Sequence, residues 1–259
     1  IIGAAMFALI FVLATKRPVA LERNKMFGYI ILALSSMIFW ALYQLAPMGL
    51  NLFIERNVDR HVMGILIAPQ WIQNINTVVI IIGGPLLSVV FTQLRERGIN
   101  INIPLQFSFA LLLIGIAFAI LPVGISLADA QGYMNFYWIL ASYVLQSVGE
   151  LFISPIGYAM VGQLAPLRLR GLMMGMWMMV TGIAAILSDQ FSKMALGDSS
   201  SIDPLITNAG FSHTFGVLGW SAIGAGVLLF VCIPFVTRLT QEKRVAEIKN
   251  ELDLKEEFV

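Results

Sequence analysis

Glu150 is a carboxylate in the middle of a long apolar stretch, residues 136–163. An ionised carboxylate inside a membrane is unfavourable unless it faces a cavity or a partner. Ser147, Glu150 and Ser154 are spaced i, i+3 and i+7, which places them on one face of a helix. This polar stripe indicates a group that binds a cation or carries a proton. A buried structural pairing is the alternative interpretation.

Two other apolar stretches carry polar side chains at helical spacing. The first set shares one face of residues 27–51 and consists of Trp40, Tyr43, Gln44 and Pro47. The second set begins the stretch 65–94 and consists of Gln73, Asn76 and Thr77. These amides could hydrogen-bond to a substrate, or they could hold neighbouring helices together. Pro47 also predicts a kink, because an interior proline removes a backbone hydrogen bond.

The sequence carries no catalytic signature. It contains no Gly-x-Ser-x-Gly, no His-Glu-x-x-His and no phosphate-binding glycine loop. Its one cysteine, Cys232, cannot form an internal disulfide, and neither His61 nor His213 has a metal-ligand neighbour in the sequence. We therefore expect neither an enzyme nor a bound cofactor. The net charge of +1 gives no reason to expect a nucleic-acid partner.

The elements that must position these residues are membrane-spanning helices. Hydrophobic residues make up 58% of the chain and charged residues 12%, whereas a soluble domain carries about 25% charge. A spanning helix needs about 20 apolar residues. On this basis we predict one truncated span followed by six full ones, at residues 1–15, 27–51, 65–94, 103–125, 136–163, 171–194 and 212–237. Because the sequence begins at Ile1 without a methionine, we expect a fragment of a longer protein.

The positive charges alternate between the connecting segments. Of the 16 Lys and Arg residues, 13 fall on one predicted side: Lys16, Arg17, Arg23, Lys25, Arg95, Arg97, Arg168, Arg170, Arg238, Lys243, Arg244, Lys249 and Lys255. Only Arg56, Arg60 and Lys193 fall on the other. The positive-inside rule makes the first side cytoplasmic, together with the C-terminal tail. Within that tail, Val245, Ile248 and Leu252 predict an amphipathic helix.

Four short motifs point to one transporter family. They are Phe-Trp-Ala-Leu-Tyr at residues 39–43, Gln73 to Thr77, Ser-Val-Gly-Glu-Leu at 147–151 with Ser154 and Pro155, and Gly171 to Trp177. On these motifs the chain resembles the C-terminal half of the bacterial proton-dependent oligopeptide transporters (the POT/PTR family), a branch of the major facilitator superfamily. Gly171 and Gly175 themselves either allow close helix contact or mark a loop-to-helix junction.

The resemblance implies an all-α integral membrane fold, a six-helix C-terminal bundle preceded by one transmembrane helix. Residues 1–26 would be the end of an extra inter-half helix and a cytoplasmic linker. Residues 27–237 would form the bundle, and 238–259 a cytoplasmic amphipathic tail. The protein would lie in the bacterial inner membrane with an N-terminal six-helix half as its partner. The lipid bilayer would surround both halves.

The resemblance also implies a function, the C-terminal half of a proton-coupled di- and tripeptide symporter that works by alternating access. Glu150 would bind the amino terminus of the peptide and take part in proton coupling, with the proton as coupling ion and no other cofactor. The substrate-binding side chains would converge on one cavity: Glu150, Asn76, Gln73, Trp40, Ser154, Trp177, Tyr43 and Ser147.

Two departures from the family pattern put part of this mechanism in question. Gln44 stands where many members have a proton-coupling Glu, and Thr77 stands where Pro is usual. Two alternatives to peptide transport therefore stay open. One is a symporter for nitrate, amino acids or drugs on the same scaffold. The other is a non-transport membrane subunit, although polar stripes on three spans argue against it.

Overall fold

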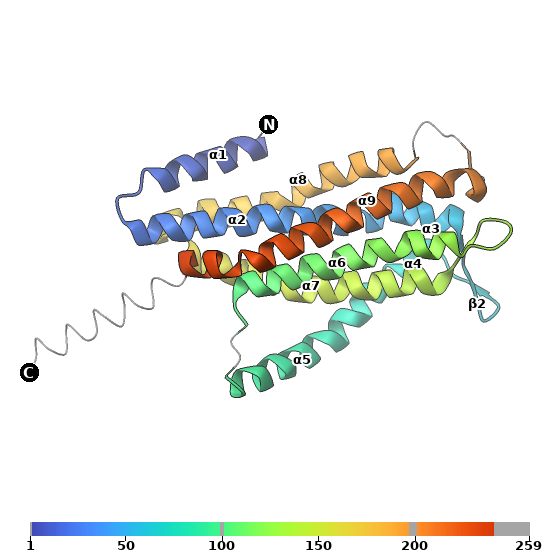
Figure 1. The fold of residues 1–259 in the computed structure, drawn as a ribbon, viewed down its shortest axis with the longest axis horizontal. Coiled ribbons are helices and arrows are strands. Elements are labelled where there is room, and N and C mark those ends of the chain that lie inside the picture. Colours follow the sequence, from blue (N-terminus) through green and yellow to red (C-terminus); the bar gives the residue numbers. More distant parts are fainter. Residues whose placement is uncertain (1, 99–100, 197–200, 241–259) are drawn as a thin grey trace, which may run out of the picture.

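The computed structural model describes residues 2–98, 101–196 and 201–240, which form a bundle of long helices (Figure 1). The helices are α1 (Ile2–Thr15), α2 (Ala20–Tyr43), α3 (Asn51–Asn57), α4 (Pro69–Ile72), α5 (Asn74–Glu96), α6 (Ile103–Ser126), α7 (Phe136–Leu164), α8 (Arg170–Leu196) and α9 (Pro204–Val231). Residues 233–240 are also helical. Within the described chain, six helical segments are long and apolar enough to cross a membrane, and α1 is a shorter apolar helix. The predicted all-α fold is thus confirmed.

Three predicted boundaries are wrong. Helix α2 begins at Ala20, so the boundary placed after residue 26 falls inside a helix. The basic residues Arg23 and Lys25 lie near the N-terminal end of α2, which is compatible with a membrane span. Lys25 Nζ donates to the Gln163 carbonyl there at 3.3 Å. Helix α9 begins at Pro204 rather than 212, since Asp203 caps it by accepting the Leu205 N–H.

The third wrong boundary is the start of the span at residue 65. Ile65 and Leu66 form strand β3, which pairs antiparallel with β2 (His61–Val62) in a hairpin. The tip of this hairpin needs positive φ values at Met63 and Gly64. The helical part of the span begins at Pro69, whose fixed φ suits a first helical turn.

The second span is bent at the predicted proline. Residues Ala46–Leu50 form a π-helical segment between α2 and α3, and Met48 leaves the helical region with φ −107° and ψ −106°. The bend is fixed to α8, because the Gly49 N–H donates to Ser192 Oγ at 3.0 Å. Ser192 Oγ in turn donates to the Ser188 carbonyl at 2.9 Å. A kink at Pro47 is therefore confirmed. At the bend, Ser192 of α8 accepts the Gly49 N–H in place of a carbonyl of the same helix.

Glycines decide how closely the helices approach. On α6 and α9, Gly115 and Gly219 leave no room for a Cβ, which would lie 2.9 Å from the opposing glycine's carbonyl oxygen in each case. Gly171 and Gly175 differ, since no described atom lies within 4 Å of a Cβ built on either. The close-contact interpretation of that pair is therefore wrong for the described chain, and the pair marks the start of α8.

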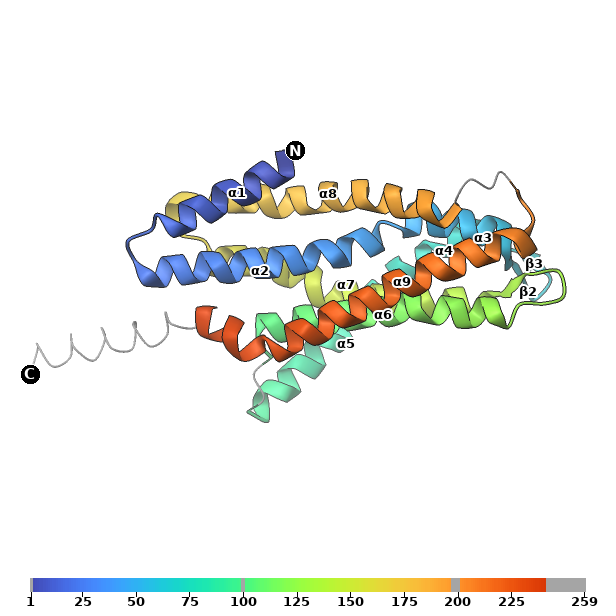
Figure 2. The ribbon, with the colours of Figure 1, turned by 45° about the horizontal axis from the view of Figure 1, so that its top comes forward.

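Figure 2 shows α5 leaving the bundle along its length.

The connecting segments divide between the two ends of the bundle (Figure 1). One end holds the α1–α2 and α7–α8 connections, the last turn of α5 and the first turn of α6. The opposite end holds the hairpin, the last turn of α8, the first turn of α9 and β1 (Val58–Asp59), which pairs in parallel with β4 (Met134–Asn135). The alternation that the charge pattern predicted is present. The predicted tail helix, at 241–259, lies outside the described residues.

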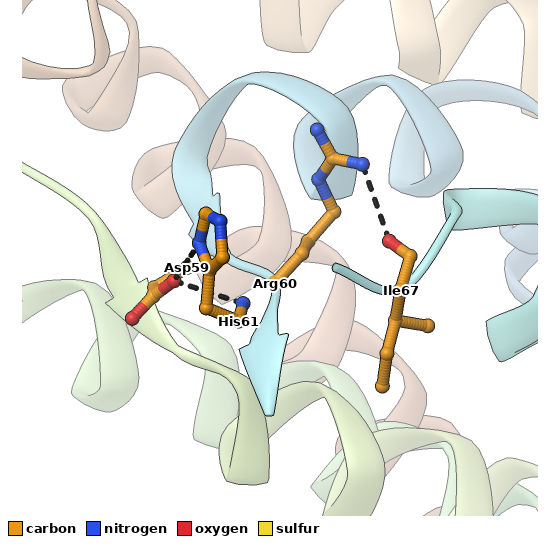
Figure 3. A network of polar contacts seen from close by, with 4 residues as sticks. All are labelled: Asp59, Arg60, His61 and Ile67. Carbon is orange, nitrogen blue, oxygen red and sulfur yellow. Dashed lines mark hydrogen bonds and ion pairs between the residues drawn. The ribbon is translucent and has the colours of Figure 1, made fainter. Parts of the chain in front are cut away.

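The hairpin end carries a small exposed polar network (Figure 3). Asp59 Oδ1 accepts the His61 backbone N–H at 3.0 Å and lies 3.1 Å from His61 Nδ1. Arg60 Nη1 donates to the Ile67 carbonyl at 3.2 Å. The bond from the His61 backbone N–H lowers the pKa of the Asp59 carboxyl. His61 thus lies in the hairpin strand β2, and its ring is exposed beside Asp59.

Candidate functional site

Glu150 is the centre of a polar cluster that joins three spans. From α7, its Oε2 accepts the Tyr43 hydroxyl of α2 at 2.7 Å and the Asn76 amide of α5 at 2.8 Å. Such short bonds to a carboxylate are stronger than bonds between neutral groups. Glu150 is partly buried, and no ion pair among the described residues includes it. The cluster holds a carboxylate in place and supplies no opposite charge to it from the described residues.

Ser147 supports the cluster from one turn earlier on α7. Its hydroxyl donates to the Tyr143 carbonyl at 2.7 Å. Its only proton is thereby used, so the oxygen is left to accept, and Asn76 Nδ2 donates to it at 3.1 Å. Asn76 thus bonds to two side chains on the face of α7 that the i, i+3 spacing predicted.

The third span has a one-residue break at Gln73, three residues before Asn76. Helix α4 ends at Ile72, Gln73 caps it, and α5 begins at Asn74. The Asn76 N–H then donates to the Gln73 carbonyl at 3.1 Å. Beside the break lies a cavity of about 190 Å³, lined by Tyr43, Gln44, Ala46, Pro47, Gln73, Asn76, Tyr143 and Gln146.

The two predicted tryptophans take part in aromatic packing. Trp40 packs edge-on against Tyr43, with ring centroids 5.4 Å apart, and so supports the side chain that donates to Glu150. Trp177 is 4% exposed and packs against Gly157 and Phe107. Of the eight predicted site residues, Tyr43, Gln73 and Asn76 line this cavity, and the convergence of all eight on one substrate cavity stays a prediction. The Trp177 ring can pack directly on Gly157 because glycine has no side chain.

Sequence reasoning missed two polar residues of the cavity wall. Gln146 lies four residues before Glu150, and Tyr143 lies four residues before Ser147. Residues four apart share a helical face, so the same periodicity that identified Glu150 would have found both. The carboxylate of Asp189 on α8 has a different arrangement. Asp189 is half exposed and pairs with Lys193 at 2.6 Å.

The comparison with known families decides the identity of this fold. The sequence profile of the POT family matches residues 2–217. The chain belongs to the POT family. Members of this family are peptide transporters rather than enzymes, and with its apolar helices the chain is a multi-pass membrane protein. The resemblance drawn from the four sequence motifs is therefore confirmed.

Similar proteins agree with this assignment. The chain is 33% identical over 250 residues to the dipeptide and tripeptide permease A of Cronobacter turicensis, covering 95% of this chain and 49% of that protein. It is 35% identical over 220 residues to the permease of the same name from Escherichia coli K12, covering 85% and 43%. The POT-family chain thus spans about half the length of the curated relatives that it matches.

Solved structures show the same fold. A mutant of a peptide transporter POT, crystallised with alafosfalin, superimposes with a TM-score of 0.80 at 27% identity, covering 93% of this chain and 47% of that one. The peptide transporter POT in complex with sulfate gives a TM-score of 0.80 at 25% identity, covering 93% and 46%. The described helices therefore have the arrangement of the corresponding part of a major facilitator transporter.

Proposed function

We propose that this chain is the C-terminal half of a proton-coupled symporter for di- and tripeptides. The other half would be an N-terminal six-helix bundle, and the substrate cavity would lie between the two halves, as expected for alternating access. Membership of the POT family and the similarity to dipeptide and tripeptide permeases support this proposal. Transport requires both halves, so this half alone would not carry it out.

The observation that carries the proposal is the unpaired carboxylate of Glu150. A charge in a low-dielectric site needs a partner of opposite sign in close geometry. Tyr43 and Asn76 supply hydrogen bonds but no charge. The ammonium group at the amino terminus of a peptide would supply both the charge and the donors, so Glu150 would anchor that end of the substrate. A carboxylate in this place disfavours nitrate, because two anions would repel each other.

Glu150 would also carry the coupling proton. Gln44 cannot do so, since an amide does not ionise in the physiological range. When no peptide is bound, a proton on Glu150 would neutralise the same charge that the ammonium neutralises in the complex. Peptide binding and proton occupancy would thus be linked at one carboxylate, which Tyr43 and Asn76 hold in place. The protein would lie in a bacterial inner membrane, and the end of the bundle that carries most of the positive charges would face the cytoplasm.

The substitution Glu150→Gln in the complete transporter tests the anchoring role. It preserves the size of the side chain and an acceptor oxygen but removes the charge. Binding of peptides with a free amino terminus should weaken by at least about tenfold, roughly 1.4 kcal/mol. Binding of amino-terminally acetylated peptides should change much less. Equilibrium binding of labelled dialanine, with acetylated dialanine as competitor, measures both.

Asp189→Asn is the matched control, because it removes a carboxylate that already pairs with Lys193 away from the cavity. The ratio of free to acetylated peptide affinity should stay at the wild-type value in this variant. An unchanged ratio in Glu150→Gln would show that Glu150 is structural and does not anchor the substrate.

A further inference from the structure

A larger cavity, of about 340 Å³, lies between α2, α8 and α9. The side chains that α2 and α8 contribute to its wall are all apolar and fall within residues 37–42 and 187–194. Helix α9 adds His213, Thr214 and Ser221 beside two apolar residues. Ligand sites in proteins typically have volumes of roughly 300–1,000 Å³ and mostly apolar walls with a few polar groups. None of these residues lines the cavity of about 190 Å³, so this is a separate candidate site.

The cavity extends over the depth of about one bilayer leaflet. A Cβ on Gly210 would lie 2.5 Å from the Ala195 carbonyl oxygen, so the end of α8 packs on the start of α9. The two helices run in opposite directions, and His213 therefore lies nearer the hairpin end of the bundle than Ser221 does (Figure 1). The eight-residue step between these two residues corresponds to about 12 Å along α9. One leaflet contributes roughly half of the hydrocarbon core of about 30 Å.

The cavity opens to the side of the bundle between α8 and α9. Met194 and Val217 line it and are 66% and 51% exposed. Helix α1 does not cover this opening, because in both views its first turn lies on the side of α8 away from α9 (Figures 1 and 2). A sideways opening at this depth of a membrane bundle meets acyl chains rather than water. The opening therefore admits an apolar component of the membrane.

His213 is the ionisable group at the hairpin end of the cavity. It lies nine residues after Pro204, about 14 Å along a helix whose full length of about 42 Å matches the 40–45 Å thickness of a whole bilayer. This position is just inside the hydrocarbon region. The Cα–Cβ bond of a helical residue points toward the helix N-terminus, which brings the imidazole toward the boundary of that region.

The polar groups at this end of the cavity have no partner in the described chain. Neither His213 nor Thr214 makes a side-chain hydrogen bond or an ion pair with another described residue. An ionisable group inside a span is unfavourable unless it meets a polar partner. At the deep end, by contrast, the Ser221 hydroxyl already donates to the Val217 carbonyl. Unpaired donors near the boundary and an apolar wall further in match a molecule with a polar head and an apolar chain.

We propose that this cavity binds one acyl chain of a membrane phospholipid, with His213 and Thr214 donating hydrogen bonds to its ester or phosphate oxygens. Imidazole has an N–H donor in both its neutral and its protonated form, and the threonine hydroxyl supplies a second donor. The acyl chain fills the apolar space between α2, α8 and α9. The site is independent of Glu150, so it does not rest on the proposed peptide transport.

Photolabelling of the complete transporter tests the proposal. The probe is a phosphatidylethanolamine that carries a diazirine on one acyl chain, added to the protein in detergent. After illumination, mass spectrometry of peptides locates the attached lipid. We expect saturable labelling within residues 37–42, 187–194 and 213–221, at least about fivefold above that at Ile116 and Val123. These two residues of α6 are 42% and 49% exposed and do not line the cavity.

Two substitutions address the two ends of the cavity. Ser221→Phe places a ring in the deep end and should lower the saturable labelling at least about fivefold. Ser126→Phe is the matched control, because Ser126 is also exposed and its hydroxyl also donates to a carbonyl of its own helix, but it does not line the cavity. His213→Leu removes the donor and should raise the lipid concentration for half-maximal labelling about fivefold, whereas His213→Gln retains a donor and should restore part of the affinity.

Several results would overturn the proposal. Labelling spread evenly over the cavity residues and α6 would show ordinary contact with surrounding lipid, and no labelling within the cavity would show that protein covers it. Wild-type labelling in both Ser221→Phe and His213→Leu, or an equal loss in Ser126→Phe, would show that the cavity does not hold the chain. Protection by palmitic acid but not by unlabelled phosphatidylethanolamine would assign the cavity to a free fatty acid instead. Should Ser221→Phe fail to fold, the wild-type labelling and His213→Leu decide.

Discussion

Replacing Gly157 by alanine tests how Trp177 is held between α7 and α8. A Cβ on Gly157 would lie 1.9 Å from Trp177 Cζ2 and 2.5 Å from Cε2, far inside van der Waals contact. The indole is rigid and 4% exposed, and Phe107 lies on it with ring centroids 6.1 Å apart. The ring has little space to move into, so the added methyl group must push the two helices apart or force the ring off its rotamer.

The expected change in the free energy of unfolding for Gly157→Ala follows from two opposing effects. Overpacking a well-packed core destabilises by about 1–3 kcal/mol. Alanine in place of glycine within a helix stabilises by roughly 0.5–1 kcal/mol. Gly157→Ala should therefore destabilise the protein by about 1–2 kcal/mol. Gly162→Ala on the same helix meets no described atom within 4 Å, so only the favourable effect remains there.

Thermal unfolding of the complete transporter in detergent measures the difference. The unfolding midpoint of Gly157→Ala should fall below that of the wild type, and that of Gly162→Ala should not fall. Adding Trp177→Leu to Gly157→Ala removes the clashing ring. The double variant should then lose less stability than the two single losses added together. Equal midpoints for Gly157→Ala and Gly162→Ala would refute the packing of Trp177 on Gly157.

Three further predictions follow from the described contacts. Tyr43→Phe removes the 2.7 Å bond to Glu150 and should lower uptake of labelled dialanine several-fold, and wild-type uptake would contradict the cluster. Asn57→Ala removes a fully buried amide that bonds to α9 and should lower the unfolding midpoint by the equivalent of about 1–3 kcal/mol, whereas an unchanged midpoint would show that the bonds are dispensable. Cysteines replacing Asp129 and Arg95 in a cysteine-free background should react with an impermeant thiol reagent on intact cells at 129 only, and labelling at 95 alone would reverse the orientation.

The sequence by itself determined the spans and the central carboxylate. Bilayer thickness requires long apolar stretches, and helical periodicity places Ser147 and Glu150 on one face, so both could be predicted without coordinates. The start of α2 was missed because basic residues at a helix end lower the local hydropathy while their long side chains still reach polar groups, as Lys25 does. The correct start of α9 is indicated by Asp203 as its N-cap and Pro204 as its first residue. The prediction from apolar stretches did not use this capping pattern.

Only the tertiary structure decided which side chains meet. Tyr43 and Asn76 come to Glu150 from 107 and 74 residues away, and helix packing, rather than local spacing, sets those distances. The motif at residues 171–177 identified Trp177 without showing that its ring would pack on Gly157. Local sequence fixes the face on which a side chain lies, whereas the crossing of helices fixes what that face contacts. The unpaired charge of Glu150 and the amide cavity beside it are products of that packing.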